Sequence, residues 1–246
     1  MTPSTEPAAR RRVAAPHQGL DPVVEQMRAA LHRAPDGQDL VCVGGELSPG
    51  LLLEGYRSGL FAMAVRIRRR SLLGWFSPDP RGVLEPERVH RSRTDRRLSK
   101  RFETRIDTAF EEVVAGCADP ARDGMWIDEE YAAVYADLHR SGRAHSVETW
   151  VDGRLVGGLF GVSVGGLFAA ESKFHRQAGA SKAAVVALAQ LLGAEATGPR
   201  LVDVQWATPH LESLGVTELA RPHYLRRLAE LVEVPEPVCF SRPSSP

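Results

Sequence analysis

The sequence has few cysteines and no long apolar run, and these shortages exclude several classes of protein. Its three cysteines, Cys42, Cys117 and Cys239, are too few and too widely spaced for a disulfide framework or a cysteine-based metal site. We therefore expect reduced thiols in a cytoplasmic protein. No apolar run approaches the roughly 20 residues of a membrane-spanning helix. The arginines at residues 10–12 also lack the apolar segment of a secretory signal.

Charge of neither sign prevails. The 31 basic and 31 acidic residues cancel, so the chain as a whole gives no reason to expect nucleic acid, although a local cluster could still bind it. Hydrophobic residues make up 43% and charged residues 25% of the 246 residues, which is ordinary for a globular protein. This length suits one large domain or two small ones. Residues 1–18 and 241–246 are rich in small and turn-forming residues, and we expect disordered tails there.

Two helices are predicted in the first third of the chain, each from a capping residue followed by proline. The two pairs are Asp21 with Pro22 and Ser48 with Pro49. The second helix is expected to end near Gly59. Residues 65–70 are predicted to be an irregular basic stretch, and residues 75–80 to form a turn, because two prolines and a serine interrupt any regular pattern.

The second half has clearer periodicity. Thr108 with Glu111 forms a capping box, and Asp128 can cap a further helix. Alternating and β-rich segments predict strands, with a tight hairpin at Asp152 and Gly153. The expected strands are residues 144–151, 154–162, 167–172 and 201–206, with a helix at 181–192. This order of helices and strands predicts an α+β, or mixed α/β, fold.

The strand at residues 201–206 carries two polar side chains in an apolar context. Alternation along a strand places Asp203 and Gln205 on one face and their apolar neighbours on the other. A carboxylate and an amide are costly to bury without partners. They therefore belong either to a structural hydrogen-bond network or to a substrate site, and the pair taken alone favours the structural interpretation.

Short motifs occur one after another along residues 40–240. Glycine-containing motifs are Gly-Gly-Glu-Leu-Ser at 44–48, Tyr-Arg-Ser-Gly-Leu-Phe at 56–61, Gly-Met-Trp-Ile at 124–127, Leu-Val-Gly-Gly-Leu-Phe-Gly-Val at 155–162 and Ser-Leu-Gly at 213–215. The others are Trp-Phe-Ser-Pro-Asp-Pro-Arg at 75–81, His-Ser-Val-Glu at 145–148, Phe-Ala-Ala-Glu-Ser-Lys-Phe at 168–174, Ala-Ser-Lys at 180–182 and Leu-Val-Asp-Val-Gln at 201–205. Together they resemble the leucyl/phenylalanyl-tRNA–protein transferase family.

The resemblance implies a small N-terminal domain, placed at residues 19–82, and a GNAT-like domain at residues 83–240 with a mixed, largely antiparallel sheet flanked by helices. Members of the family move leucine or phenylalanine, and sometimes methionine, from a charged tRNA to a protein that begins with arginine or lysine. The new N-terminus marks that protein for degradation by the N-end rule. The resemblance implies no cofactor, no metal and no membrane, and we expect a monomer.

The resemblance also implies a catalytic group. It places Gln205 at the reacting amine, Asp203 behind it as a hydrogen-bond partner, and Glu171 against an amino group in the site. The aminoacyl ester is already activated, so positioning can supply much of the acceleration. Because an amide is a poor general base, we favour Gln205 as an orienting acceptor, with the proton passing through the tRNA ribose or water. The alternative for Glu171 is a surface carboxylate at a strand edge.

Residues that would bind the donor carry over in the same way. Trp126 would stack on the terminal adenosine, and Phe168 would line the aminoacyl side. Trp75 and Phe76 stand at paired aromatic positions, where plain core packing is an equal alternative. The full substrate-binding set is Met63, Trp75, Phe76, Trp126, Phe168, Ser172, Lys173, Phe174 and Ser181. The basic residues expected to contact tRNA phosphates, or else to form a solvated loop, are Arg66, Arg68, Arg69 and Arg70.

Three positions depart from the family pattern. Met63 stands where an aromatic residue would help to hold the donor, and Gly179 replaces an asparagine. Lys173 replaces a methionine that shapes the pocket for the amino-acid side chain. Either the Lys173 stem packs and its ammonium reaches solvent, or the pocket has changed its preference.

Two other functions stay open at this point. The sequence of residues 176–181 differs at one position from the pyrophosphate-binding loop of CoA-dependent GNAT acyltransferases. In that loop, backbone N–H groups hold phosphate at the start of a helix. A tRNA- or peptide-binding homologue without transfer activity is the second alternative, given Met63 and Lys173. The retained Glu171, Asp203 and Gln205 argue against it.

Overall fold

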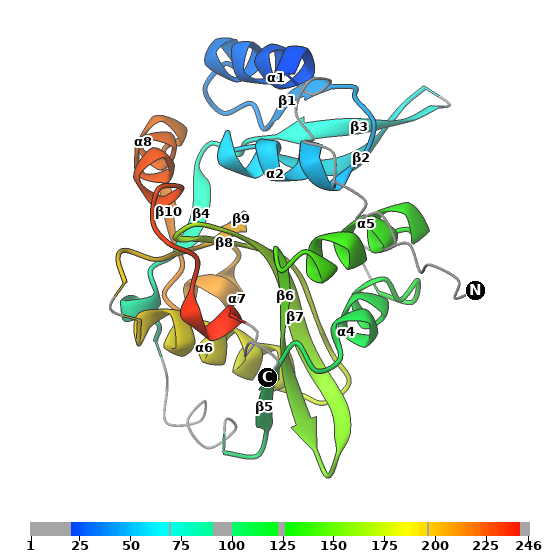
Figure 1. Cartoon of the computed structure of the whole chain (residues 1–246), viewed down its shortest axis with the longest axis vertical. Helices are drawn as coiled ribbons and strands as arrows, with labels where there is room; N and C mark the ends of the chain where they lie inside the picture. Colours follow the sequence, from blue (N-terminus) through cyan, green and yellow to red (C-terminus); the bar gives the residue numbers. More distant parts are fainter. Residues whose placement is uncertain (1–20, 69, 91–99, 123–125, 196, 242–246) are drawn as a thin grey trace, which may run out of the picture.

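The computed structural model describes residues 21–68, 70–90, 100–122, 126–195 and 197–241. The predicted tail at 1–18, residues 242–246 of the second tail, and Arg69 lie outside the described residues. The chain forms two sheets, with strand orders β1-β3-β2 and β10-β4-β9-β8-β7-β6-β5. Helices flank both sheets (Figure 1). The predicted α+β fold, with a small N-terminal sheet and a larger, mostly antiparallel one, is therefore confirmed.

The small sheet is covered by the two predicted N-terminal helices (Figure 1). Its elements are α1 (Asp21–Arg33), β1 (Leu40–Val43), α2 (Pro49–Arg57), β2 (Phe61–Ile67) and β3 (Arg70–Phe76). Ser48 caps α2 as predicted, because its side chain accepts a hydrogen bond from the Leu51 backbone N–H. The buried face of α2 carries Leu51, Leu52 and Tyr56. That apolar face explains why so short a helix is stable here.

The region predicted to be irregular is instead a hairpin. Residues 65–67 belong to β2, Val65 pairs with Leu72, and the pairing continues to Ile67 and Arg70. The arginines obscured this pattern because they lie on an exposed ladder, where charge is tolerated. Trp75 and Phe76 are the last residues of β3, so the turn predicted for residues 75–80 begins only at Ser77.

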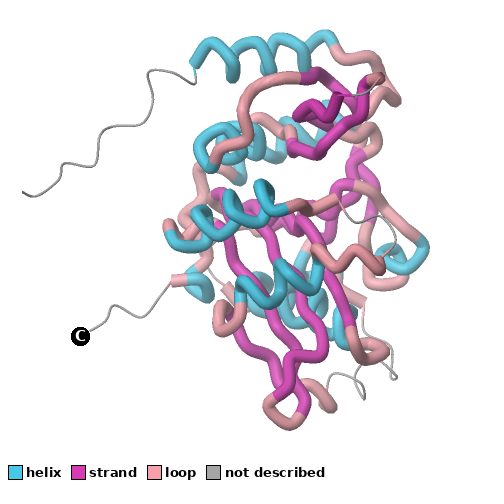
Figure 2. The backbone as a smooth tube through the Cα atoms, turned by 90° about the vertical axis from the view of Figure 1, so that its right-hand side faces the viewer, coloured by secondary structure: helices cyan, strands magenta, loops and turns pink. Residues whose placement is uncertain are grey.

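The larger sheet has helices on both of its faces, which Figure 2 shows from the side. Its strands are β4 (Arg81–Leu84), β5 (Glu103–Ile106), β6 (Ala144–Val151), β7 (Arg154–Val164), β8 (Leu167–His175), β9 (Leu201–Gln205) and β10 (Thr217–Leu219). The accompanying helices are η1 (Pro86–Arg88), α4 (Phe110–Cys117), α5 (Glu129–Arg140), α6 (Ala180–Gly193), α7 (Pro209–Glu212), α8 (Arg221–Leu231) and η2 (Val238–Phe240). Alternation along β7 directs Phe160 toward α4 and α5, and Leu159 into the core shared with α6. The domain boundary predicted between residues 82 and 83 lies inside β4.

The predicted capping box is wrong. Ala109 is the N-cap of α4 and offers no side-chain bond, while Thr108 donates its hydroxyl to Glu148. The backbone N–H groups of Thr108 and Ala109 also donate to Glu148, at 2.9 and 3.0 Å. Glu148 is completely buried in β6, so its carboxylate needs these donors and occupies the role given to Glu111. Asp128 caps α5 as predicted, through the Tyr131 N–H at 3.0 Å.

Two neighbouring parallel strands separate at their carboxyl ends. Strands β8 and β9 pair through three positions, the last joining Ala169 to Asp203. Beyond it, β8 continues along β7, whereas β9 continues along β4. Glu171 and Gln205 stand just past the point of separation. No helix in the described part of the chain has the length and apolar character needed to cross a membrane.

Candidate active site

A cavity of about 270 Å³ fills the space where β8 and β9 separate, and we call it the cleft. Its apolar lining residues are Leu159, Ala170, Val185, Val204 and Leu211. Its polar or amphipathic lining residues are Arg122, Glu171, Ser172, Lys173, Gln205, Trp206 and Thr208. The cleft therefore combines an apolar wall with a few convergent polar groups, which is the usual composition of a small-molecule site.

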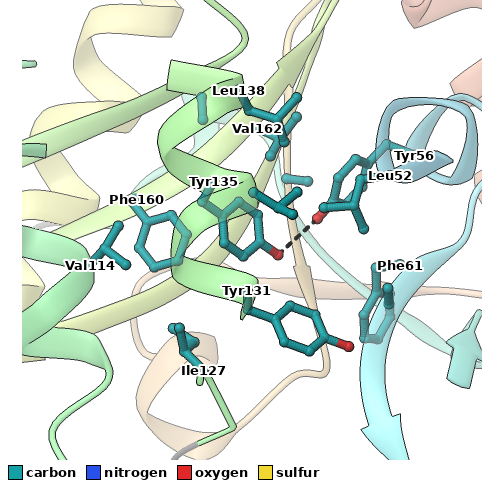
Figure 3. Packing of buried hydrophobic residues seen from close by; sticks show 14 of the residues in the cluster. Leu52, Tyr56, Phe61, Val114, Ile127, Tyr131, Tyr135, Leu138, Phe160 and Val162 are labelled. Atoms are coloured by element: carbon teal, nitrogen blue, oxygen red, sulfur yellow. Dashed lines mark hydrogen bonds between the residues drawn. The ribbon is translucent and has the colours of Figure 1, made fainter. Parts of the chain in front are cut away.

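Glu171 is the acidic group of the cleft. Its Oε2 accepts a hydrogen bond from the Tyr135 hydroxyl at 2.7 Å, and that hydroxyl lies 3.3 Å from the hydroxyl of Tyr56. Figure 3 shows the two tyrosines converging from α5 and α2. Glu171 Oε1 is shielded from solvent and has no hydrogen-bond partner in the described part of the chain. This oxygen can accept a hydrogen bond from an amino group brought into the cleft.

Burial changes the protonation of Glu171. It raises the pKa of the carboxyl group to about 7, although the Tyr135 hydroxyl acts in the opposite direction by stabilising the charged form. The group thus changes charge near neutral pH. Such a shifted pKa, in a cleft and next to an unpartnered oxygen, is typical of a functional carboxylate.

Asp203 is the second carboxylate, and its surroundings are the opposite. It is completely buried, and its two oxygens accept hydrogen bonds from Arg81 at 2.9 and 2.6 Å. The Tyr224 hydroxyl donates to it at 2.8 Å. The Arg81 guanidinium lies between the rings of Phe61 and Tyr224, at 4.9 and 4.7 Å from their centroids. Asp203 is therefore held as part of a structural network and does not line the cleft.

Gln205 reaches the cleft because the strand is irregular. Its φ of 64° lies in the left-handed region, which costs a non-glycine residue about 1–2 kcal/mol. The Asp203 carboxylate holds this conformation by accepting the Gln205 backbone N–H at 2.9 Å. The β4 register also shifts here, pairing Gly82 with Gln205 but Val83 with Asp203. A Cβ at Gly82 would lie 2.6 Å from the Ala207 nitrogen, so glycine is required for this close approach.

The prediction that Asp203 and Gln205 share one face is wrong, because the bulge at this register shift interrupts the alternation. Asp203 supports the Gln205 backbone, whereas the Gln205 side-chain amide bonds only to the Asp203 backbone carbonyl, at 3.4 Å. The amide oxygen of Gln205 accepts no hydrogen bond from the residues that the structure describes. It can therefore serve an incoming donor.

Comparison with known proteins decides the family. One family model, described as "Leucyl/phenylalanyl-tRNA protein transferase", matches residues 83–229, and the model of that family's N-terminal domain matches residues 45–79. The leucyl/phenylalanyl-tRNA–protein transferase of Thiobacillus denitrificans is 46% identical over 204 residues, covering 81% of this chain and 87% of the relative. That of Aromatoleum aromaticum is 46% identical over 199 residues, covering 79% and 81%. That of Nitrosomonas europaea is 43% identical over 205 residues, covering 82% and 84%.

The chain belongs to the leucyl/phenylalanyl-tRNA–protein transferase family. The predicted aromatic residues of this transferase occupy different places. The Trp126 ring contacts those of Tyr131 and Tyr135 edge-on, with centroids 5.2 and 6.3 Å apart, next to the hydroxyls that reach Glu171. Phe76 is half-buried, and its ring centroid lies 6.3 Å from that of Trp206, which lines the cleft. Both residues therefore lie at the edge of the candidate site.

Four other predicted binding residues lie away from the cleft. Trp75 is buried and donates its indole N–H to the Gly44 carbonyl at 3.0 Å, so the core-packing alternative describes it. Phe168 is completely buried against Phe240 because its side chain points to the opposite side of the sheet from the tyrosines of α5. The remaining two are the buried Phe174 in β8 and Ser181 in the first turn of α6. Neither lines the cleft.

Lys173 and the basic cluster complete the predicted set. Lys173 lines the cleft, and its pKa is lowered by burial and by the nearby Arg122. Its ammonium forms no ion pair with a carboxylate, Glu171 included, among the residues that the structure describes. Arg66, Arg68 and Arg70 lie exposed at the end of the β2–β3 hairpin, and Met63 lies half-buried within it. The structure does not bring the arginines to the cleft.

Sequence reasoning missed four residues of the transferase's site. Tyr56 and Arg81 lie inside motifs that were recognised, but the sequence does not reveal which residues their polar groups contact. Tyr135 and Tyr224 lie on apolar helix faces, where they count as core. The one signal that could have identified them is a tyrosine hydroxyl on a buried face, since such a group needs a hydrogen-bond partner.

Proposed function

We propose that this protein moves leucine or phenylalanine, and also methionine, from a charged tRNA to the N-terminal amine of a protein that begins with arginine or lysine. Family membership supports the reaction class, because the family acts with an aminoacyl-tRNA donor and a protein acceptor. The observation that carries the proposal is the cleft, where an apolar wall adjoins the unpartnered Glu171 Oε1. An apolar side chain can pack on the wall while its amino group bonds to the carboxylate.

In this reaction one bond forms and another breaks. The acceptor amine attacks the ester carbon, forming the C–N bond of a peptide, and the ester C–O bond to the terminal ribose breaks. The proton lost by the amine passes to the ribose oxygen that leaves, directly or through water. No covalent enzyme intermediate is needed, so holding the two substrates in line supplies the acceleration.

Each polar group of the cleft has a distinct part in this proposal. Glu171 Oε1 accepts a hydrogen bond from the amino group of the donor amino acid and fixes the ester above the wall of the cleft. The Gln205 amide oxygen orients the attacking amine, and Asp203 acts indirectly by fixing the Gln205 backbone. Arg81 and Tyr224 are positioning residues for Asp203.

The tRNA would bind mainly through its single-stranded end. Trp126 offers an aromatic face near the tyrosines of the cleft, on which the terminal adenosine can stack. Met63 provides an apolar surface in place of a second ring. Arg66, Arg68 and Arg70 offer positive charge to phosphates on the hairpin. Neutralising them should reduce the salt dependence of tRNA binding by about one unit of slope for each phosphate that is no longer paired with an arginine.

A single-turnover assay tests the proposed function. Charged leucyl-, phenylalanyl- and methionyl-tRNA would each be mixed with excess enzyme and a peptide that begins with arginine. The expected product is the peptide extended by one residue, and the same peptide with an acetylated N-terminus should give none. Absence of transfer from all three donors would contradict the proposal. Acetyl transfer from acetyl-CoA to the same peptide would instead support the CoA-dependent alternative.

A further inference from the structure

A second cavity, of about 520 Å³, lies between the β2–β3 hairpin and the start of α5, and we call it the acidic groove. Ala64 and Leu73, a pair on the hairpin, form one side, while the first turn of α5 forms the other. Three carboxylates line the groove: Glu46, Asp128 and Glu130. No basic residue lines it in the described part of the chain. Its charge therefore suits a cationic ligand.

The three carboxylates have unused acceptor capacity. None forms an ion pair with another described residue, and Asp128 uses only Oδ1, for the cap on Tyr131. Three or more acidic, histidine or cysteine residues nowhere converge closely enough, within the described chain, to hold a metal ion. The carboxylates are instead spread along the groove, which suits an elongated organic cation with several N–H donors better than a small metal ion.

Tyr131 gives an independent sign of a ligand. It is only 4% exposed, and it lines the groove. Its hydroxyl is shielded from solvent and has no hydrogen-bond partner among the described residues. Figure 3 shows this hydroxyl directed toward Phe61, with no dashed line to any of the residues drawn. A buried hydroxyl without a partner is unfavourable unless a bound molecule supplies one.

The acidic groove and the cleft share no lining residue, but helix α5 connects them. Tyr131 precedes Tyr135 by four residues on α5, so the two side chains lie on one face of the helix, about 6 Å apart along its axis. Tyr135 bonds Glu171, and the Trp126 ring contacts both tyrosines. An acceptor whose amine is oriented by Gln205 can therefore extend its first side chain toward Tyr131.

We propose that the acidic groove binds the cationic side chain of the acceptor's first residue, arginine or lysine. This inference rests on the proposed function, because it assigns the part of the site that selects the acceptor. The ammonium or guanidinium lies between Asp128 and Glu130, and the Tyr131 hydroxyl accepts one of its N–H groups. The groove thereby selects acceptors whose first residue is cationic, although the chain as a whole carries no net charge.

The test compares two peptides that differ only in the first residue: arginine, or citrulline, its neutral isostere. Transfer of leucine to each is measured with the wild-type enzyme and with the double variant Asp128→Asn and Glu130→Gln. Asparagine is as good a helix cap as aspartate, so α5 should stay intact. Glu129→Gln is the matched control, because it removes one charge from the same helical turn without altering the groove.

The double variant should raise KM for the arginine peptide about 10-fold or more, while KM for the citrulline peptide and kcat for both stay within about twofold. Tyr131→Phe should act in the same direction with a smaller change, and Glu129→Gln should leave both peptides unaffected. An unchanged KM for the arginine peptide, or an equal rise for both peptides, would overturn the proposal.

Direct binding separates this proposal from the proposed function. The affinity of the full-length enzyme for each fluorescently labelled peptide would be measured by anisotropy, without tRNA. If the wild type transfers nothing but prefers the arginine peptide, and the double variant loses that preference, the proposed function fails and the groove assignment holds. If transfer is normal and the double variant keeps the preference for arginine, only the groove assignment fails.

Discussion

The two carboxylates on the separating strands β8 and β9 stand in opposite environments. Asp203 has a bidentate arginine, a tyrosine and a backbone N–H on its oxygens, and it is completely buried. Glu171 has one tyrosine, one unpartnered oxygen and a pKa raised to about 7 by burial. A carboxylate with all its partners inside the fold stabilises a conformation. One with an unused oxygen is available to a substrate.

Removing the arginine that pairs with Asp203 should have the largest effect on stability. Arg81→Leu removes the bidentate partner and leaves a buried, unpaired carboxylate, so the free energy of unfolding should fall by about 3–5 kcal/mol. Urea denaturation at pH 8 would measure this loss. Arg28→Leu is the control, because Arg28 pairs with Glu54 at the surface and should contribute about 0–1 kcal/mol. Equal losses in both variants would contradict the assigned role of Arg81.

Gln205→Ala sharpens the comparison on the catalytic side. The side chain that orients the amine is lost, while the Asp203 bond to the residue 205 backbone N–H can persist. Single-turnover transfer should fall about 100-fold, which corresponds to about 2.7 kcal/mol of transition-state stabilisation. The dissociation constant of the charged tRNA should change less than threefold. A variant with near-normal turnover would exclude Gln205 from the reaction.

Tyr135→Phe should move the pH dependence of transfer. The Tyr135 hydroxyl stabilises the charged form of Glu171, so its removal raises the pKa of that carboxyl group further above about 7. Because the carboxylate form is required, the rising limb of the rate against pH should shift to higher pH. Rates from pH 6 to 9 would show the shift, and the titration of the peptide amine is common to both enzymes. A shift to lower pH would contradict the hydrogen-bond argument.

Lys173→Met should give the smallest effect. An ammonium without a carboxylate partner, next to the apolar wall, disfavours an aliphatic or aromatic donor side chain. The variant should raise transfer from leucyl- and phenylalanyl-tRNA by a few-fold, or about 1 kcal/mol. Transfer rates for each charged tRNA on one arginine-initiated peptide would measure it. Equal rates and equal donor ranking in both proteins would mean that the ammonium lies in solvent in the working enzyme.

Much of the fold could be predicted because its signals are local. Ser48 and Asp128 cap helices through bonds to residues three positions away, and the Asp152–Gly153 hairpin follows from its turn residues. The missed features depend on residues far apart in the sequence. Thr108 bonds Glu148, 40 positions away, instead of capping its own helix. The arginines of the β2–β3 hairpin lie on an exposed ladder, and the local sequence pattern does not predict this pairing.

The candidate site divides in the same way. The motifs identified Glu171 and Gln205, and the pairing of β8 with β9 places both at one cleft. Arg81 lies 122 positions from Asp203, and Tyr135 lies 36 positions from Glu171, so their contacts follow from tertiary packing. The bulge that gives Gln205 its left-handed backbone depends on Gly82 of a neighbouring strand. Periodicity within one strand cannot reveal it.

The most direct test of the comparison measures stability and transfer together in two isosteric variants, Glu171→Gln and Asp203→Asn. Glu171→Gln should lose about 100-fold or more in single-turnover transfer but lose no stability at pH 8. The raised pKa of Glu171 means that its contribution to stability declines as pH rises through about 7, and glutamine lacks this decline. Asp203→Asn should lose about 3–5 kcal/mol of unfolding free energy, because Arg81 is left buried and unpaired. The reverse pattern, with Glu171→Gln unstable but active and Asp203→Asn stable, would contradict the account.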